Sequence, residues 1–352
     1  GNGVSRLNYP LIDGKVVGCP SHLLEPQTTQ LVPYSESFTS GFWTNASIGT
    51  APTLESGYLA PDGTNNAFKI SNPNKDTFWY YSSIVLNTSA RSIYARTVSG
   101  TGTAQLLTHS SNTNNLFTIT EQWQRFDVNT ANGTGASNFY AIDFRGSGTL
   151  DEIIIWGANG TDDQNYPTSY IPTNGTTVTR NAETCNGAGT SATFNDSEGV
   201  LMAEISALAN DGTFRFISLK NNTTVDIIRI GYITTSNRIE IQNYKAGALF
   251  NLFNYEFQDV KTNSKIAFKW KDNDFQLYIN GLNVLSNTSV TGWGSGVFQS
   301  LQFDQHNGGN DFYGNTKQIQ YYDSALTDSE LETLTSWVSF SDMANGQQYI
   351  IE

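Results

Sequence analysis

Carboxylates and histidines are the side chains of this chain whose spacing bears most directly on catalysis. Hydrolysis of a glycosidic bond with retention of configuration needs two carboxyl groups about 5–5.5 Å apart, which a strand supplies at positions i and i+2 of one face. Asp151 and Glu152 are adjacent and therefore face opposite sides of a strand, while Asp272 and Asp274 flank a turn. His109 stands beside two serines without the Gly-x-Ser-x-Gly pattern of a nucleophile elbow. We therefore predict no catalytic residues.

Two groups of aromatic and polar residues predict ligand binding instead. In the stretch TFWYY the alternation of a strand places two aromatic pairs on opposite faces; we assign one pair to the core and take Trp79 and Tyr81 as an exposed platform. Flat aromatic faces cover apolar faces of sugar rings, while amides and carboxylates bond hydroxyl groups. A glycine-rich segment further along combines the same residue types at Asp304, His306, Asn310, Asp311, Phe312 and Tyr313.

The composition favours short strands over helices. Of the 352 residues only 14% are charged, whereas 12% are aromatic and 31 residues are glycine. Aromatic and β-branched residues favour the pleated surface of a sheet, and glycine and asparagine supply the positive φ of tight turns. The length suits two domains of about 150 residues each. We therefore predict an all-β chain of two tandem antiparallel jelly-roll sandwiches.

Strand patterns and proline-containing segments set the expected boundaries. The strand patterns recur every ~8–14 residues, which is the spacing of antiparallel sandwiches. Near the end, ALTDSELETLTSWV predicts one short C-terminal helix, because Thr327 and Glu330 have the spacing of a capping box. The expected parts are an N-terminal extended arm at 1–33, a first sandwich at 34–171, a join at 172–181 and a second sandwich at 182–352.

The charge balance excludes two classes of partner. The chain carries 32 acidic and 19 basic residues, which gives a formal net charge of −13 at pH 7. Such a surface repels phosphate backbones and anionic headgroups, so we expect no nucleic acid partner. No run of about 18 apolar residues occurs, so we expect no membrane insertion.

The two cysteines leave two alternatives open. Cys19 lies in the expected arm and Cys185 lies just beyond the expected join. A disulfide between them would tether the arm to the second sandwich in an oxidising compartment. Two free thiols fit the sequence equally well.

Several motifs carry a resemblance to known families. YSESFTSGFWTN, APDGTNNAFKI, EQWQRFDV and LDEIIIWGA resemble the jelly rolls of carbohydrate-binding modules. KWKDNDFQLYINGLNVLSN followed by ALTDSELETL is similar to laminin-G-like, concanavalin A-like jelly rolls. The order of the whole chain, with LLEPQTTQLVPYSESF and PTSYIPTNGTTVTRNAET as its sharpest parts, resembles the head-fibre and tail-fibre adhesins of tailed bacteriophages.

These resemblances imply a function, a location and a metal. The resemblance to fibre adhesins implies a non-enzymatic protein of the virion surface, hence extracellular, that binds host cell-surface polysaccharide and contacts other virion proteins as a homotrimer. The resemblance of the first sandwich to carbohydrate-binding jelly rolls implies a structural calcium ion, for which Glu36 and Asp151 occupy the matching positions. Two alternatives stand beside it, namely a secreted polysaccharide-degrading enzyme with an appended binding module and a purely structural virion protein that binds no glycan.

Overall fold

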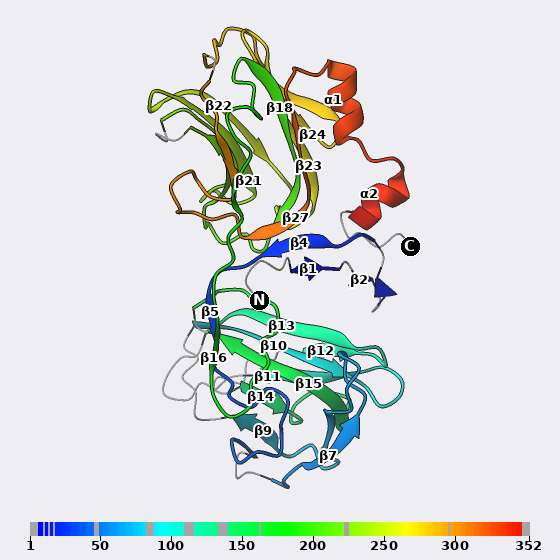
Figure 1. Ribbon diagram of the computed structural model, residues 1–352. Helices are drawn as coiled ribbons and strands as arrows, with labels where there is room; N and C mark the ends of the chain where they lie inside the picture. Colours follow the sequence, from blue (N-terminus) through cyan, green and yellow to red (C-terminus); the bar gives the residue numbers. More distant parts are fainter. Residues whose placement is uncertain are drawn as a thin grey trace. The chain divides into compact units, whose positions relative to one another are not determined.

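The chain forms two compact units, each built from antiparallel strands (Figure 1). One unit is Gln27–Ala182, and the other combines Gly1–Pro26 with Glu183–Glu352. The predicted all-β fold of antiparallel sandwiches is therefore confirmed. The computed structural model describes residues 6–346, with the exception of 10, 13–14, 17, 46–48, 82–87, 109–115, 133–139, 162, 222–224 and 295.

The expected arm at 1–33 is divided between the two units. Residues up to Pro26 belong to the unit that Glu183 begins again, because the strand Ser21–Leu24 (β4) pairs with the strand Gly314–Tyr322 (β27). An edge strand offers unpaired backbone groups, and this segment of the arm satisfies them. The following strand, Thr28–Gln30 (β5), belongs to the unit Gln27–Ala182. It pairs with Val178–Arg180 (β16) of that same unit. Both cysteines are free and exposed.

The unit Gln27–Ala182 contains two five-stranded sheets that enclose a core. Alternating residues of the facing strands fill this core, for example Ile93, Leu106, Tyr140, Ile153 and Ile155, all fully buried. The first sheet has the order β13 (Gln124–Asn132), β10 (Thr88–Arg96), β15 (Glu152–Thr161), β8 (Ala67–Ser71) and β7 (Thr53–Tyr58). The second has the order β12 (Leu116–Ile119), β11 (Gly102–Thr108), β14 (Tyr140–Asp143), β9 (Phe78–Tyr81) and β6 (Trp43–Asn45).

The other unit contains a seven-stranded and a six-stranded sheet around an aromatic core that includes Trp270, Phe268 and Phe298. A short hairpin, β2 (Leu11–Ile12) with β3 (Lys15–Val16), accompanies them. The seven-stranded sheet has the order β1 (Leu7–Asn8), β4, β27, β18 (Glu198–Ala207), β23 (Ser264–Lys271), β24 (Phe275–Ile279) and β25 (Leu282–Asn287). The six-stranded sheet has the order β17 (Asn186–Ala188), β26 (Ser300–Gln302), β19 (Arg215–Lys220), β20 (Ile227–Tyr232), β21 (Arg238–Lys245) and β22 (Ala248–Glu256).

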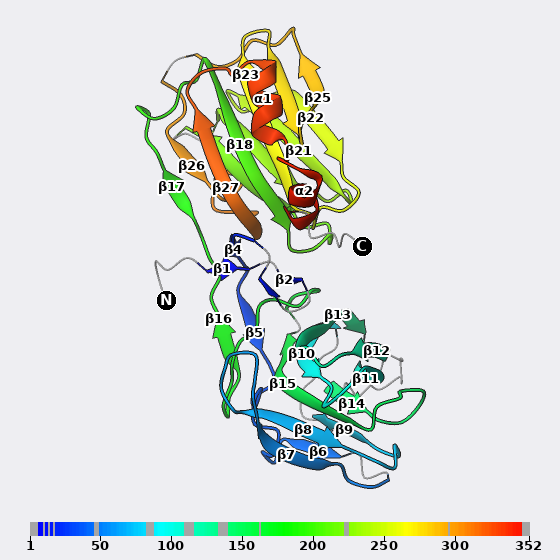
Figure 2. The ribbon, with the colours of Figure 1, turned by 90° about the vertical axis from the view of Figure 1, so that its right-hand side faces the viewer.

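A helix covers the outward face of the seven-stranded sheet. Helix α1 (Asp328–Thr335) begins after Thr327, which forms the predicted capping box with Glu330. Its Leu331 packs with Val200, Met202, Ala267 and Tyr278, which point away from the main core. Figures 1 and 2 show α1 on the side of this sheet that faces away from the six-stranded sheet. The outward face of the six-stranded sheet has no such helix among the described residues.

A second helix, α2 (Phe340–Gly346), follows the first. The prediction of one helix missed it, because FSDMANG spans seven residues and carries no apolar stripe. Neither helix in the described part of the chain is long and apolar enough to cross a membrane.

Candidate binding face

The outward face of the six-stranded sheet carries a row of polar side chains across four strands. Ile217 of β19 and Ile230 of β20 point into the core. Because side chains alternate along a strand, the residues next to them in each strand point outward. Ser218 pairs with Gln302 of β26 on one side and with Arg229 of β20 on the other. We call this surface the Arg229 face and define it as Phe216, Ser218, Lys220, Arg229, Gln242, Tyr244 and Gln302.

Aromatic rings hold Arg229 in place on this face. Its guanidinium carbon lies 4.4 Å from the ring centre of Tyr244 and 5.5 Å from that of Phe216. The Phe216 ring lies over Gly231, where a Cβ would come within 2.3 Å of Phe216 Cδ1. Phe214, 37% exposed, stacks on Phe216 with ring centres 5.7 Å apart. Glycine at 231 therefore lets an aromatic ring lie flat on the sheet beside the arginine.

The guanidinium of Arg229 has no acidic partner among the described residues. It makes no hydrogen bond or ion pair with any residue that the structure describes, and its Nε is buried without a partner. The hydroxyl of Ser218, which is fully buried directly across from Arg229, is also unpaired. Burial lowers the pKa of Arg229, and the charge of Tyr244 opposes this effect. Buried polar groups without partners cost free energy, so this arrangement is typical of a site that a ligand completes.

The predicted loop lies beside this face through Asp304 and His306. Asp304 is 3% exposed and accepts hydrogen bonds from Asn186 Nδ2 at 3.0 Å and from the His306 backbone N–H at 2.5 Å. Lys220 Nζ donates to the carbonyl of His306 at 2.9 Å. Burial lowers the pKa of His306, as do the charges of Arg229 and Lys220, against the opposing charge of Asp304. The loop therefore adds a neutral imidazole to a basic surface.

The backbone of His306 is held in an unfavourable conformation. Its φ is 109°, in the region that favours glycine, which costs of order 1–3 kcal/mol for another residue. Such outliers cluster at binding sites, because only surrounding structure that is fixed for function maintains them. The Nδ1 atom of His306 is buried and unpaired.

The remaining predicted loop residues have structural contacts. Asn310 accepts a hydrogen bond from Phe216 N–H at 3.1 Å through its carbonyl, and its side chain donates to Gln305 at 2.6 Å. The Tyr313 hydroxyl donates to Asp311 at 3.0 Å, and burial raises the pKa of that carboxyl.

Phe312 is a core residue rather than a ligand contact. It is 0% exposed, and its ring centre lies 6.1 Å from that of Phe303 and 6.2 Å from that of Tyr232. Phe312 was predicted to bind ligand because its neighbours in the sequence are polar. In an extended segment, however, every second side chain points inward.

The predicted platform at Trp79 and Tyr81 lies on β9. By register Trp79 is opposite Ile142 and Tyr81 is opposite Tyr140, and both of these partners are buried in the core. The side chains of Trp79 and Tyr81 themselves lie outside the described part of the structure, so the assignment of this pair as a platform remains a prediction.

The structure does not bring the predicted calcium ligands together. Ser35, which precedes Glu36, accepts a hydrogen bond from Ala158 N–H, whereas Asp151 directly precedes the first residue of β15. Seven residues of strand separate these points by roughly 20 Å. The carboxylate of Glu36 already accepts hydrogen bonds from the Tyr170 hydroxyl at 2.6 Å and from Asn66 at 2.8 Å. No cluster of three metal-binding side chains occurs among the described residues. The two residues therefore do not fit one ion.

A second group of aromatic residues lies on the outward face of the sheet β13–β10–β15–β8–β7. Tyr94 pairs with Arg125 on one side and with Trp156 on the other. The indole of Trp123 donates to the carbonyl of Leu59 at 3.2 Å, which places the segment after β7 over this face. Trp156 is 5% exposed, and its ring centre lies 5.4 Å from that of Tyr94 and 4.8 Å from that of Tyr170. We call this group the aromatic patch, and its residues are Tyr58, Tyr94, Trp123, Trp156 and Tyr170.

Sequence reasoning did not single out the Arg229 face or the aromatic patch. The signal for the first lies in the segment VDIIRIGYIT, where Arg229 interrupts a run of apolar residues at an outward position. An arginine in a strand that is otherwise hydrophobic is a candidate for a site. The absence of a partner for it was not visible, because partners come from other strands.

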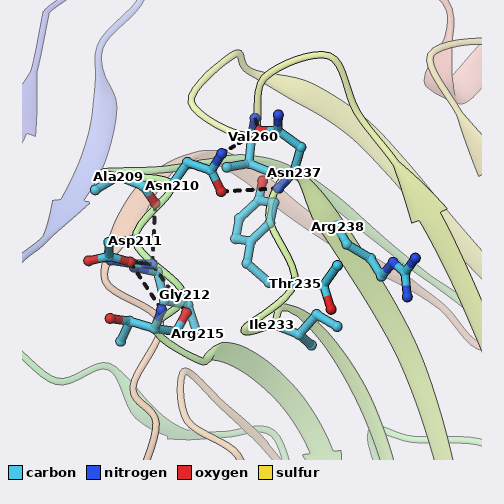
Figure 3. Close-up of a pocket in the computed structure, with 12 residues that line it drawn as sticks. Ala209, Asn210, Asp211, Gly212, Arg215, Ile233, Thr235, Asn237, Arg238 and Val260 are labelled. Carbon is cyan, nitrogen blue, oxygen red and sulfur yellow. Dashed lines mark hydrogen bonds and ion pairs between the residues drawn. The ribbon is translucent and has the colours of Figure 1, made fainter.

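A small depression at one end of the unit is a structural feature (Figure 3). Arg215, 2% exposed, binds both carboxylate oxygens of Asp211 at 2.8 and 2.9 Å and also donates to the carbonyl of Ala209. The cavity between these residues, Tyr232 and Arg238 measures about 10 Å³, which is room for roughly one water molecule. It cannot hold a sugar ring.

No family model and no curated protein matches this chain. Solved structures that resemble it include the IT-sialidase CBM40 of Ruminococcus gnavus bound to α2,3-sialyllactose, with a TM-score of 0.35, 14% identity, and coverage of 44% of this chain and 96% of that chain. Another is the SAP-like pentraxin of Limulus polyphemus (TM-score 0.35, 13% identity, 44% and 76% covered). A third is a toad ovary galectin in complex with thio-digalactose (TM-score 0.28, 13% identity, 40% and 98% covered).

Proposed function

We propose that this chain binds carbohydrate on the Arg229 face without turning it over. The observation that carries the proposal is a sheet face, not covered by the helix that covers the other sheet, on which a cation and a hydroxyl lack partners beside an aromatic ring. Tyr244 supplies a flat face for a sugar ring, and the amide of Gln242, which uses one of its two N–H groups on Glu240, keeps the other for a hydroxyl group.

Binding without hydrolysis is part of this proposal. Retaining hydrolysis needs two carboxyl groups about 5–5.5 Å apart, each free to act on the bond. Asp304 beside the face is nearly buried and accepts hydrogen bonds from Asn186 and His306, and Glu240 accepts one from Gln242 at 2.7 Å. These engaged carboxylates support a binding role.

The sequence resemblance to phage fibre adhesins supplies the location in this proposal. We place the chain on a virion surface, where several copies contact host polysaccharide and weak single-site affinities add through multivalency. Mass spectrometry of purified virions from the source of this sequence tests the location, and its absence from the particles would refute it.

Immobilised bacterial surface polysaccharides test the binding itself. The full chain is passed over a panel of capsular polysaccharides and O-antigens, retention is followed by interferometry, and new reducing ends are measured after long incubation. We expect retention without reducing ends. Tyr244→Ala should weaken retention at least tenfold, because it removes the aromatic platform, while Tyr94→Ala in the aromatic patch should retain it.

Three results would contradict the proposal. New reducing ends would show an enzyme. Loss of binding in Tyr94→Ala with full binding in Tyr244→Ala would move the site to the aromatic patch. No retention on any polysaccharide would favour a purely structural role.

A further inference from the structure

The guanidinium of Arg229 is a partly buried cation that no described carboxylate neutralises. It lies over Tyr244, and its Nε is buried without a partner. A cation that is removed from water without a counter-ion is costly, because its desolvation is not repaid. The chain as a whole carries a net charge of −13, so acidic partners are abundant elsewhere in the sequence.

The carboxylates near this cation are engaged with other groups. Asp304 Oδ2 accepts from Asn186 and its Oδ1 accepts from the His306 backbone. Glu240 lies on the same face, two residues before Gln242 and opposite Gly231. Its carboxylate accepts a hydrogen bond from the Gln242 amide at 2.7 Å. The positive charge of the face is therefore left for a ligand.

Further polar groups lie around Arg229, two of them buried beneath the surface of the face. The Ser218 hydroxyl is fully buried opposite Arg229 and has no partner. Lys220, two positions along the same face, uses one of its three ammonium protons on the His306 carbonyl. His306 Nδ1 is also buried and unpaired. Two cations, a hydroxyl and an imidazole thus surround one part of the sheet.

We infer that the Arg229 face takes a carboxylated sugar, whose carboxylate binds the guanidinium of Arg229. This inference rests on the proposed function and names the class of its ligand. The planar fork of a guanidinium matches the two oxygens of a carboxylate. Because the Tyr244 ring lies against the guanidinium at 4.4 Å, the edge of the fork is the part that remains for such a bidentate contact.

Carboxyl-reduced polysaccharide gives a direct test. We take one polysaccharide that binds the chain and contains uronic or nonulosonic acid. Its carboxylates are reduced to neutral alcohols by carbodiimide activation and borohydride. Both forms are immobilised, and a sulfated polysaccharide of neutral sugars serves as a third arm. Affinities are measured for the unaltered full chain, Arg229→Gln, Arg229→Lys and the matched control Arg125→Gln.

We expect the unaltered chain to prefer the native form over the reduced form by at least tenfold. Arg229→Gln should lose at least tenfold on the native form and bind both forms equally, and Arg229→Lys should lie between, because an ammonium lacks the planar fork. Arg125→Gln should keep the full preference. Circular dichroism and thermal unfolding verify that each variant is folded.

Each contrary outcome has a distinct meaning. Equal binding of native and reduced forms by the unaltered chain overturns this inference while the proposed function stands. An undiminished preference in Arg229→Gln places the carboxylate elsewhere and overturns it as well. Stronger binding to the sulfated arm overturns the choice of carboxylate. If no polysaccharide binds the chain, the proposed function is refuted together with this inference.

Discussion

Arg125 in one unit and Arg229 in the other are both placed over a tyrosine on the outward face of a sheet, but they differ in their partners. Arg125 lies 5.9 Å from the Tyr94 ring centre, and its Nη2 donates to Ser92 Oγ at 2.7 Å and to the Thr168 carbonyl at 2.5 Å. Arg229 lies 4.4 Å from the Tyr244 ring centre and donates to no described residue. The Nε atoms of both lack partners, so the difference lies in the terminal nitrogens.

This difference separates a structural arginine from a candidate ligand contact. The segment that contains Thr168 folds back over the sheet of the first unit and consumes the hydrogen bonds of Arg125. No described segment does the same on the Arg229 face, where Ser218, the neighbouring serine, keeps a free hydroxyl. Stacking on a tyrosine therefore does not distinguish the two arginines. They differ in whether their terminal nitrogens donate hydrogen bonds within the chain.

Arg215 is the arginine of this comparison that has a carboxylate partner, and Asp211→Ala should have the largest effect on stability. The substitution leaves a 2% exposed guanidinium without its counter-ion, which typically costs about 3–5 kcal/mol in free energy of unfolding. Urea unfolding of the full chain measures this. A cost below about 1 kcal/mol would show that the remaining carbonyl contacts of Arg215 suffice, and the comparison would lose its paired end.

Stability should also distinguish the two stacked arginines. Arg125→Gln removes hydrogen bonds from a charged donor to Ser92 and Thr168, which are worth about 1.5–3 kcal/mol. Arg229→Gln removes no hydrogen bond, and the loss of its contact with the Tyr244 ring is offset by the removal of a partly buried, unneutralised cation, so we expect a change within about 1 kcal/mol. Both are measured by urea unfolding under the same conditions. An equal loss in the two variants would mean that Arg229 is as structural as Arg125.

The smallest expected effect is the loss of the stability contributed by the Asp211–Arg215 ion pair at low pH. Burial raises the pKa of Asp211, but the hydrogen bond and charge of Arg215 outweigh it and hold the pKa below the ordinary value of 3.8. A carboxyl with a lowered folded pKa contributes stability that is present above its ordinary pKa and is lost as the pH falls through the folded value. We expect the free energy of unfolding to fall between pH 5 and pH 2, by less in Asp211→Asn than in the unaltered chain. An identical slope in both would exclude Asp211 as a source.

Much of the fold was predictable because it depends on local alternation and turn chemistry. The capping box of Thr327 and Glu330 and the inward positions of Ile217 and Ile230 follow from patterns a few residues long. Phe312 was misassigned for the same reason: its neighbours are polar, yet its own position points inward. Glu36 and Asp151 were paired by analogy, and strand β15 separates them.

The sequence by itself determined that this chain is all-β, that its strands are short and antiparallel, and which residue types were present for binding. Only the tertiary structure decided which of those residues lack partners. Ser218 and Arg229 meet where β19 pairs with the following strand β20, and the segment of His306, 86 residues beyond Lys220, is joined to them by the Lys220 hydrogen bond. Pairing between distant strands sets which polar groups are satisfied, and residues adjacent in the sequence do not encode it.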